Sequence, residues 1–378
     1  MAKKYKDLTK QEIKEKQSER INSALAHFAE TIISRMEVMK DSNWKMGWLT
    51  GKSKIGLPQN VTGRVYTGSN AFLCQLHTAT NGYKSPVYLT IKQIKDLGAF
   101  PKKGEKSIPI FKWGVFYYDR ETGKKVTSEE VEKIPQDDRE KMFKTVPFLK
   151  FFNEWNVDQT TLEEVNKEKY DELVSRFETY YVEDSEGMYK NEAIDELLSS
   201  QSWVCPINYK DRYPEAVYNK TKDEIFIPRK DQFKISSTPE EIYKDGMEYY
   251  STLIHEMTHS TGHPDRLDRI KAGASFGDND YAKEELVAEL TAAIVGSSMG
   301  FDNRIQENNI AYLQSWTKSL KEEPKFLLSI MKDVNKASSM VLEPIDAERL
   351  KLGQKALLEG NLDGLHEKAA NEKQLAAI

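Results

Sequence analysis

An H-E-x-x-H motif, His255-Glu256-Met257-Thr258-His259, lies inside a stretch of the chain with helical periodicity. On a helix, residues four apart lie on one face, one turn apart, so both imidazoles can reach the same metal ion. The glutamate between them projects beside that ion, where it can take a proton from a water molecule. We therefore predict a metal site with His255 and His259 as ligands and Glu256 as the catalytic base. The alternative is a pair of structural histidines.

The helix that carries the motif has clear start and stop signals. Thr238 is followed by Pro239 and two glutamates, which is typical of a capped helix start with acids in the first turn. Gly262 is a stop signal at the other end. A hairpin is predicted over 216–228, and its edge strand could hold an extended peptide.

A catalytic zinc ion needs a third protein ligand and one open position. Glu285, on a second helix predicted over 281–300, would complete a gluzincin-like arrangement, because small residues around it let that helix approach closely. Glu289 is four residues further on, and would either orient a ligand histidine or serve as an alternative ligand. Asp265 competes for the third position, because it follows Gly262 at the spacing of metzincins. Glu284, His263, Arg266 and Tyr281 are predicted to be surface or packing residues.

Charge is unevenly distributed along the chain. The net charge of the 378 residues is −5, but residues 1–118 contain 20 Lys/Arg and 9 Asp/Glu, a net of +11, which leaves −16 for the other 260 residues. Within 42–118 there are 11 basic residues, 2 acidic residues and 12 aromatic residues. Cations that follow phosphates and rings that stack on bases are typical of single-strand nucleic-acid surfaces. The alternative is that the rings fill a small core.

Periodicity predicts the remaining elements. A long amphipathic helix is expected over 10–40, strands over 86–90, 107–118 and 145–157, and a third helix of the second half over 310–323. Residues 122–141 are predicted to form a solvated insertion between two strands.

Two segments together resemble the ArdC-type antirestriction proteins. The first half resembles their N-terminal single-stranded-DNA-binding domain, and the second half resembles their zincin-like metallopeptidase domain. The matching segments include Pro58-Gln59-Asn60, Thr62-Gly63-Arg64-Val65-Tyr66-Thr67-Gly68-Ser69-Asn70, Lys103-Gly104-Glu105-Lys106, the stretch from Thr252 to His263, and Tyr281 to Leu290.

The resemblance implies a mobile-element protein that binds single-stranded DNA and holds Zn²⁺, with the third ligand on the helix after the H-E-x-x-H helix. The candidate DNA contacts are Trp44, Lys45, Trp48, Arg64, Tyr66, Asn70, Lys102, Lys103 and Lys106. The implied fold class is α+β, with an α+β DNA-binding module followed by a mostly helical zincin-like domain that contains a small β-sheet.

The predicted domain order has four parts. Residues 1–157 form the DNA-binding domain with an insertion at 119–141, 158–189 an acidic helical connector, 190–340 the metallopeptidase domain and 341–378 a charged helical tail.

Composition excludes several classes. The two cysteines, Cys74 and Cys205, are far apart and form no C-x-x-C pair, which excludes a disulfide framework and a cysteine-based zinc site. The apolar stretches are too short for a membrane span, and the charged N-terminal segment is unlike a secretory signal. We therefore expect a cytoplasmic protein without a membrane partner.

Three functions remain open. The first is a DNA-binding protein with a zinc-dependent peptidase site and a peptide or protein substrate. The second is a non-catalytic DNA-binding protein with a structural zinc site. The third is a peptidase whose basic half packs against something else.

Overall fold

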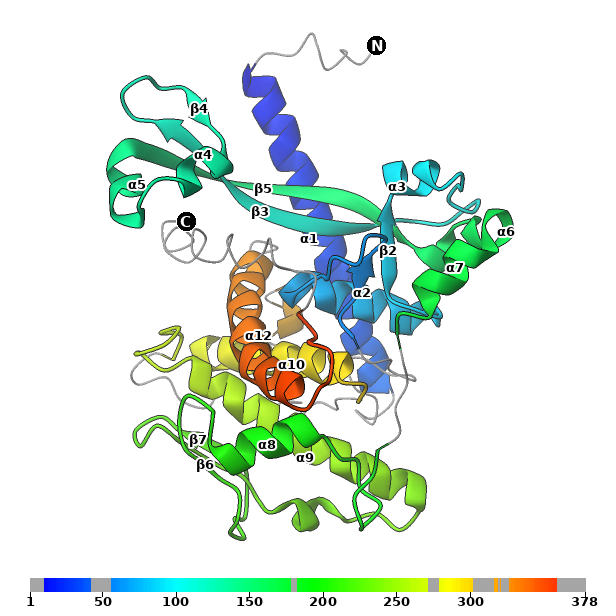
Figure 1. Cartoon of the computed structure of the whole chain (residues 1–378), viewed down its shortest axis with the longest axis vertical. Coiled ribbons are helices and arrows are strands. Elements are labelled where there is room, and N and C mark those ends of the chain that lie inside the picture. Colours follow the sequence, from blue (N-terminus) through cyan, green and yellow to red (C-terminus); the bar gives the residue numbers. More distant parts are fainter. Residues whose placement is uncertain are drawn as a thin grey trace.

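The computed structural model describes residues 10–41, 56–177, 182–270, 279–301, 316–318, 320 and 326–358. Trp44, Lys45 and Trp48 lie outside the described residues, as do residues 359–378 of the predicted tail and most of the helix predicted over 310–323. The described chain has a mixed α+β fold (Figure 1), and the predicted fold class is confirmed.

A five-stranded sheet and its flanking helices form the N-terminal half. The strand order is β1-β2-β5-β3-β4, and every neighbouring pair is antiparallel except β1 with β2. The elements are α1 (Lys10–Asp41), β1 (Gln59–Asn60), α2 (Gly68–Asn81), β2 (Val87–Thr90), α3 (Ile91–Asp96), β3 (Ile108–Asp119), β4 (Lys125–Val126), α4 (Ser128–Glu132), α5 (Gln136–Met142), β5 (Phe143–Asn156), α6 (Leu162–Val165) and α7 (Lys167–Val174).

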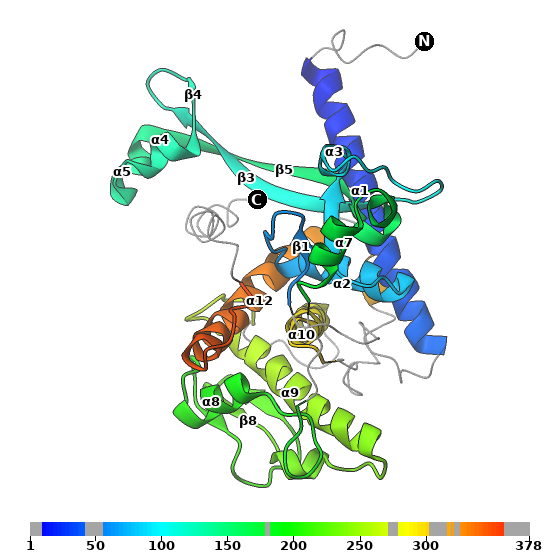
Figure 2. The ribbon, with the colours of Figure 1, turned by 45° about the vertical axis from the view of Figure 1, so that its right-hand side comes forward.

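The two longest strands, β3 and β5, form a ribbon that extends away from the helices of the C-terminal half. Figures 1 and 2 show it extending from the sheet toward β4, α4 and α5 at its far end. The predicted insertion at 122–141 thus contains short elements of its own. The start of α4 is stabilised by a reciprocal hydrogen-bond pair between Thr127 and Glu130.

Helices dominate the C-terminal half. They pack α9 on α10, α10 on α12 and α12 on α8, with a small sheet of order β6-β8-β7 beside α9. The elements are α8 (Glu192–Ser200), β6 (Ile207–Asn208), β7 (Val217–Asn219), β8 (Glu224–Phe226), α9 (Pro239–Thr261), α10 (Asn279–Ser298) and α12 (Phe326–Lys351).

Local signals explain where α9 and its hairpin lie. The Thr238 side chain accepts a hydrogen bond from Glu241 N, Pro239 occupies the first turn, and the helix ends at Gly262. The predicted hairpin is formed by β7 and β8, with Tyr218 opposite Ile225. β7 is an edge strand of the three-stranded sheet.

One hydrophobic core joins the two halves of the chain. Buried side chains of α1 and α2 belong to the same cluster as those of α9, α10 and α12. The domain boundary predicted at residue 340 falls inside α12, and Val341, Leu342 and Ile345 are buried there. The first turns after residue 340 therefore continue a core helix, whereas Leu350, near its end, is exposed.

In the described part of the chain, no helix is both long and apolar enough to cross a lipid bilayer.

Candidate metal centre

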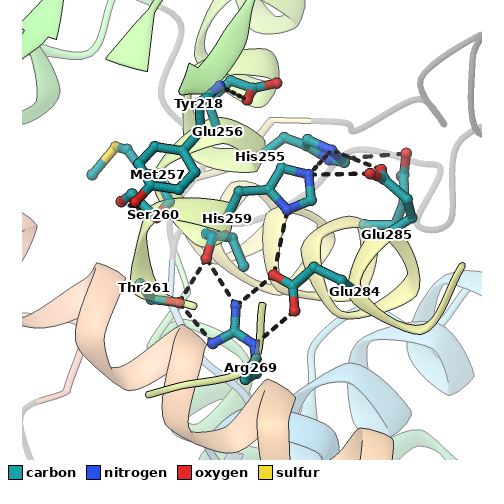
Figure 3. A network of polar contacts seen from close by, with 12 residues as sticks. Tyr218, His255, Glu256, Met257, His259, Ser260, Thr261, Arg269, Glu284 and Glu285 are labelled. Atoms are coloured by element: carbon teal, nitrogen blue, oxygen red, sulfur yellow. Dashed lines mark hydrogen bonds and ion pairs between the residues drawn. The ribbon is translucent and has the colours of Figure 1, made fainter. Parts of the chain in front are cut away.

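Three donor groups from two helices converge at the interface of α9 and α10. The Nε2 atoms of His255 and His259 lie 3.0 Å apart, and the Glu285 carboxylate lies 3.4 Å from the first and 3.5 Å from the second (Figure 3). These three residues form a group of the described residues whose donor atoms could hold a metal ion.

The donor spacing fits a tetrahedral metal. Metal–ligand bonds of ~2.0–2.1 Å at tetrahedral angles place neighbouring donor atoms roughly 3.3 Å apart. The two Nε2 atoms lie 3.0 Å apart, and each lies near one carboxylate oxygen of Glu285: His255 Nε2 is 3.4 Å from Oε2, and His259 Nε2 is 3.5 Å from Oε1. These separations are close to the tetrahedral value, and one donor atom from each residue lies within 4.8 Å of the others. Two imidazoles and one carboxylate are also a donor set typical of catalytic zinc.

The charge balance of the site is unusual for a buried cluster. Burial alone would lower the pKa of His255 and His259, but the carboxylate of Glu285 beside them raises both above their usual value. Burial would raise the pKa of Glu285, and the two histidines instead hold it well below its ordinary range. The buried Glu285 carboxylate is thus balanced by the two imidazoles, which it makes easier to protonate.

Glu284 orients His259 from the other side of the ring. Its Oε1 lies 3.3 Å from His259 Nδ1, and Arg269 holds the same carboxylate with contacts of 2.8 and 2.9 Å. Arg269 also donates to the backbone oxygen of Thr258. Burial would raise the pKa of Glu284, but Arg269 and His259 keep it below its usual value.

The sequence had predicted a surface or packing role for Glu284, and nothing in it pointed to Arg269. Glu284 precedes Glu285 directly, and only the packing of α10 on α9 shows that both carboxylates face histidines.

Glu289 lies near the other histidine. Its Oε1 is 4.0 Å from His255 Nδ1, which has no hydrogen-bond partner among the described residues. Glu289 thus faces the ring nitrogen of His255 that lies opposite the donor nitrogen, as expected for a carboxylate that orients a ligand histidine. Asp265 lies elsewhere, on an exposed turn, with its side chain 89% exposed and 3.6 Å from His263 Nδ1. The geometry therefore favours Glu285 over Asp265.

Glu256 points away from the histidine pair toward the small sheet (Figure 3). Its Oε2 accepts a hydrogen bond of 2.6 Å from the backbone N–H of Tyr218, on the edge strand β7. The Tyr218 hydroxyl donates to Asp223, and Arg266 bonds both Asp223 and Ser260 O. The strand is thereby tied to the residues after the motif.

The candidate DNA contacts divide into two groups. Tyr66 donates its hydroxyl hydrogen to Glu154, and the Asn70 side chain bonds both the N–H and the C=O of Phe111. The ammonium group of Lys102 bonds Asp158 O. These polar groups serve the fold, whereas Arg64, Lys103 and Lys106 are exposed.

Comparisons with known proteins agree with this architecture. The family described as the N-terminal domain of anti-restriction factor ArdC matches residues 22–155, and the family described as zincin-like metallopeptidase matches residues 192–332. The antirestriction ArdC protein from plasmid R388 has a similar structure, with a TM-score of 0.56 and 26% identity over 85% of this chain and 97% of that one. The chain is an ArdC-like protein.

A second structure of the R388 protein is a Mn(II)-bound form, which is 25% identical to this ArdC-like chain with the same TM-score of 0.56. Two proteins of Escherichia coli, each named DNA primase TraC, are 29% identical over 322 residues. The match covers 83% of this chain but only 26% and 19% of those proteins, so the chain spans about a quarter or less of their length. The uncharacterized protein y4eC of Sinorhizobium fredii is 24% identical over 310 residues, which cover 82% of this chain and 88% of that protein.

Proposed function

We propose that this ArdC-like chain is an antirestriction protein that binds single-stranded DNA and hydrolyses a peptide bond at a metal centre. The convergence of His255, His259 and Glu285 at tetrahedral donor spacing is the observation that carries the hydrolytic part. The metal we propose is Zn²⁺, and the Mn(II)-bound form of the R388 protein supports a divalent ion at such a site.

The residues divide the chemistry between them. A divalent ion held by His255, His259 and Glu285 would polarise the substrate carbonyl and make a water molecule more acidic. Glu256, whose carboxylate lies on the β7 side of the histidine pair and accepts from Tyr218 N, would take the proton of the attacking water and deliver it to the leaving nitrogen. Glu284, fixed by Arg269, keeps the His259 ring in the orientation that turns Nε2 toward the other donors.

The edge strand supports an extended peptide as substrate. β7 has one unpartnered side in the three-stranded sheet, and Glu256 bonds its backbone at Tyr218. A peptide that added to this edge would pass alongside the general base.

The metal assignment is tested by measuring bound Zn²⁺ and Mn²⁺ per chain. We expect one equivalent for the unaltered protein and loss of it in His255→Ala and Glu285→Ala. Asp265→Ala is the matched control, since its carboxylate is exposed on a turn. Full metal content in Glu285→Ala, or loss in Asp265→Ala, would show that the third ligand is wrong.

Catalysis is tested separately from metal binding. Glu256→Gln keeps the size and the acceptor oxygen of the side chain, so we expect metal binding to persist while peptide hydrolysis falls by about 10²–10⁴-fold. If this variant still protects transferred DNA from restriction as well as the unaltered protein does, the protein acts as a non-catalytic DNA-binding protein.

A further inference from the structure

The ribbon formed by β3 and β5 has two unlike faces. Side chains alternate along each strand, and the register pairs Lys112 with Lys150, Gly114 with Phe148 and Phe116 with Val146. One face, here called the basic face, contains all the lysines of the two strands together with Lys125 of β4, which pairs with Tyr118. These lysines are Lys112, Lys125, Lys144 and Lys150.

The opposite face has no lysine or arginine, and helices pack against the ribbon at its base and at its tip. Near the base of the ribbon, Phe111 stacks on Phe28 of α1 with ring centroids 6.1 Å apart. Near the tip, Phe143 is buried, and so is Val131 of α4, which packs against β3. The basic face is buried at its base, where Ile108 and Ile110 belong to the core, and its lysines from Lys112 onward are exposed.

Aromatic rings lie between the lysines of the basic face. Phe116 and Phe148 stack with centroids 4.2 Å apart, and Lys125 lies 3.6 Å from the Phe116 centroid. A glycine at 114 makes room for this stack, because a Cβ there would lie 2.4 Å from the Phe148 ring. Phe152 follows Lys150 on the same face and is 45% exposed.

The lysines of this face differ from those on the helices. Lys92, Lys141 and Lys167 each pair with an aspartate three or four residues away. Within the described parts of the chain, no carboxylate forms an ion pair with Lys125, Lys144 or Lys150. Glu154, at the base of the same face, is buried and accepts from Tyr66. Lys125, Lys144 and Lys150 thus form a cationic surface with aromatic rings between them.

We propose that the basic face of the β3–β5 ribbon is a binding surface for single-stranded DNA, with Lys144 and Lys150 on phosphates and Phe152 stacked on a base. This inference rests on the proposed DNA-binding function and places it on residues other than the DNA contacts predicted from the sequence. The face from Lys112 to Tyr118 is roughly 20 Å long at ~3.3 Å per residue, enough for several nucleotides. An exposed ring favours a single strand, because the faces of bases in a duplex are already stacked.

The test is fluorescence anisotropy of a labelled oligothymidylate with the full chain over a range of salt concentrations. In the double variant Lys144→Ala, Lys150→Ala, we expect weaker binding. We also expect the plot of log affinity against log salt concentration to be less steep by about 1.4, because each single-strand phosphate contact contributes ~0.7 to its slope. The matched control is Lys133→Ala, Lys141→Ala, which removes the same charge from exposed lysines of the α4–α5 segment that do not belong to the basic face.

A ring test separates stacking from charge. Phe152→Leu keeps an apolar side chain without a π face, and we expect affinity to fall by about 5- to 100-fold. Phe152→Tyr keeps the ring and should bind as the unaltered protein does. Circular dichroism and the unfolding midpoint of each variant establish that it is folded.

The outcomes distinguish the surface from the function. If the unaltered chain does not bind the oligonucleotide, the proposed DNA-binding function itself fails. If it binds, but the ribbon and control lysine variants behave alike, the DNA lies elsewhere on the protein. If the lysine variant loses affinity but Phe152→Leu binds as tightly as the unaltered protein, the proposal is wrong. Equal affinity of the unaltered protein for a DNA duplex and for the oligothymidylate would also overturn it.

Discussion

Glu154 is a carboxylate buried in the N-terminal half, where it accepts a hydrogen bond from the hydroxyl of Tyr66. Burial raises its pKa to about 7, although Tyr66 and Arg64 act in the opposite direction. Tyr66 lies in a segment that resembles a DNA-binding motif, so the motif at this position includes a residue whose polar atom serves the core. A motif identifies the residue type and leaves its partner undetermined.

This carboxylate makes stability depend on pH. In the unfolded chain a glutamate loses its proton near pH ~4.5, while folded Glu154 keeps it until about pH 7. The folded state therefore binds more protons between these values, and its stability falls as pH rises through that window, by at most about 3 kcal/mol.

Glu154→Gln should remove this dependence, because the amide oxygen still accepts from Tyr66 and carries no charge. We expect the variant to gain stability over the unaltered protein as pH rises from 5 to 8, as measured by denaturant unfolding. A stability difference that stays constant across this range would contradict the assignment.

At the scale of elements, α10 has two roles. One side carries Glu284, Glu285 and Glu289 toward α9, and the helix also packs against α2 of the N-terminal half. Gln75 of α2 bonds Ile294 O directly. The alanines of α10 were predicted to permit close approach, and Ala288 and Ala293 are fully buried.

The contact between α2 and α12 is equally close. Ser69 N donates to Asn335 Oδ1 at 2.7 Å, and Gly68 has a φ of +53°. A Cβ on Gly68 would lie 2.0 Å from Asn335 Oδ1 and 2.8 Å from its Cα. The backbone of α12 prevents a simple side-chain adjustment, so only glycine fits.

We therefore expect Gly68→Ala to lower the free energy of unfolding by about 3 kcal/mol or more, from strained backbone and overpacking together. Gly82→Ala is the control, because Gly82 has a φ of +66° and a Cβ added to it would meet no atom within 4 Å. Gly82→Ala should lower the free energy of unfolding by only about 1–2 kcal/mol, from the strain of a left-handed backbone conformation. Equal losses in the two variants would show that the α2–α12 contact contributes nothing.

At the scale of the whole molecule, the two matched families share one interior. The cluster that contains Phe28 and Leu73 also contains Leu253 and Val341. The two halves therefore share their main core, although the sequence families divide them cleanly, and a second, smaller cluster of residues 87–177 lies within the first part of the chain.

A shared interior predicts a single cooperative unfolding transition. Metal bound at ~100 times its dissociation constant should stabilise the whole chain by about 2.7 kcal/mol, including the N-terminal half that has no metal ligand. Calorimetry with and without Zn²⁺ measures this, and Glu285→Ala should abolish the shift. Two separate transitions, of which only one responds to metal, would contradict the shared core.

Much of this protein could be predicted from local patterns. The spacing of apolar residues predicted α1, periodicity and start and stop signals predicted α9, and a hairpin over 216–228 was predicted where β7 and β8 pair. The four-residue spacing of His255 and His259 depends on the geometry of one helix, so it needed no knowledge of the rest of the fold.

What only the tertiary structure decided involves residues far apart in the chain. Glu285 and Asp265 were both possible as third ligand, and the packing of α10 against α9 distinguishes them geometrically. Arg269 reaches Glu284 across a turn that has no sequence signature. Charge counting indicated a basic segment at 1–118, but three lysines of the basic face, Lys125, Lys144 and Lys150, follow it in the sequence. Only strand pairing places them on the same face as Lys112. Side-chain direction follows from local periodicity, whereas the choice of partner follows from which elements share a core.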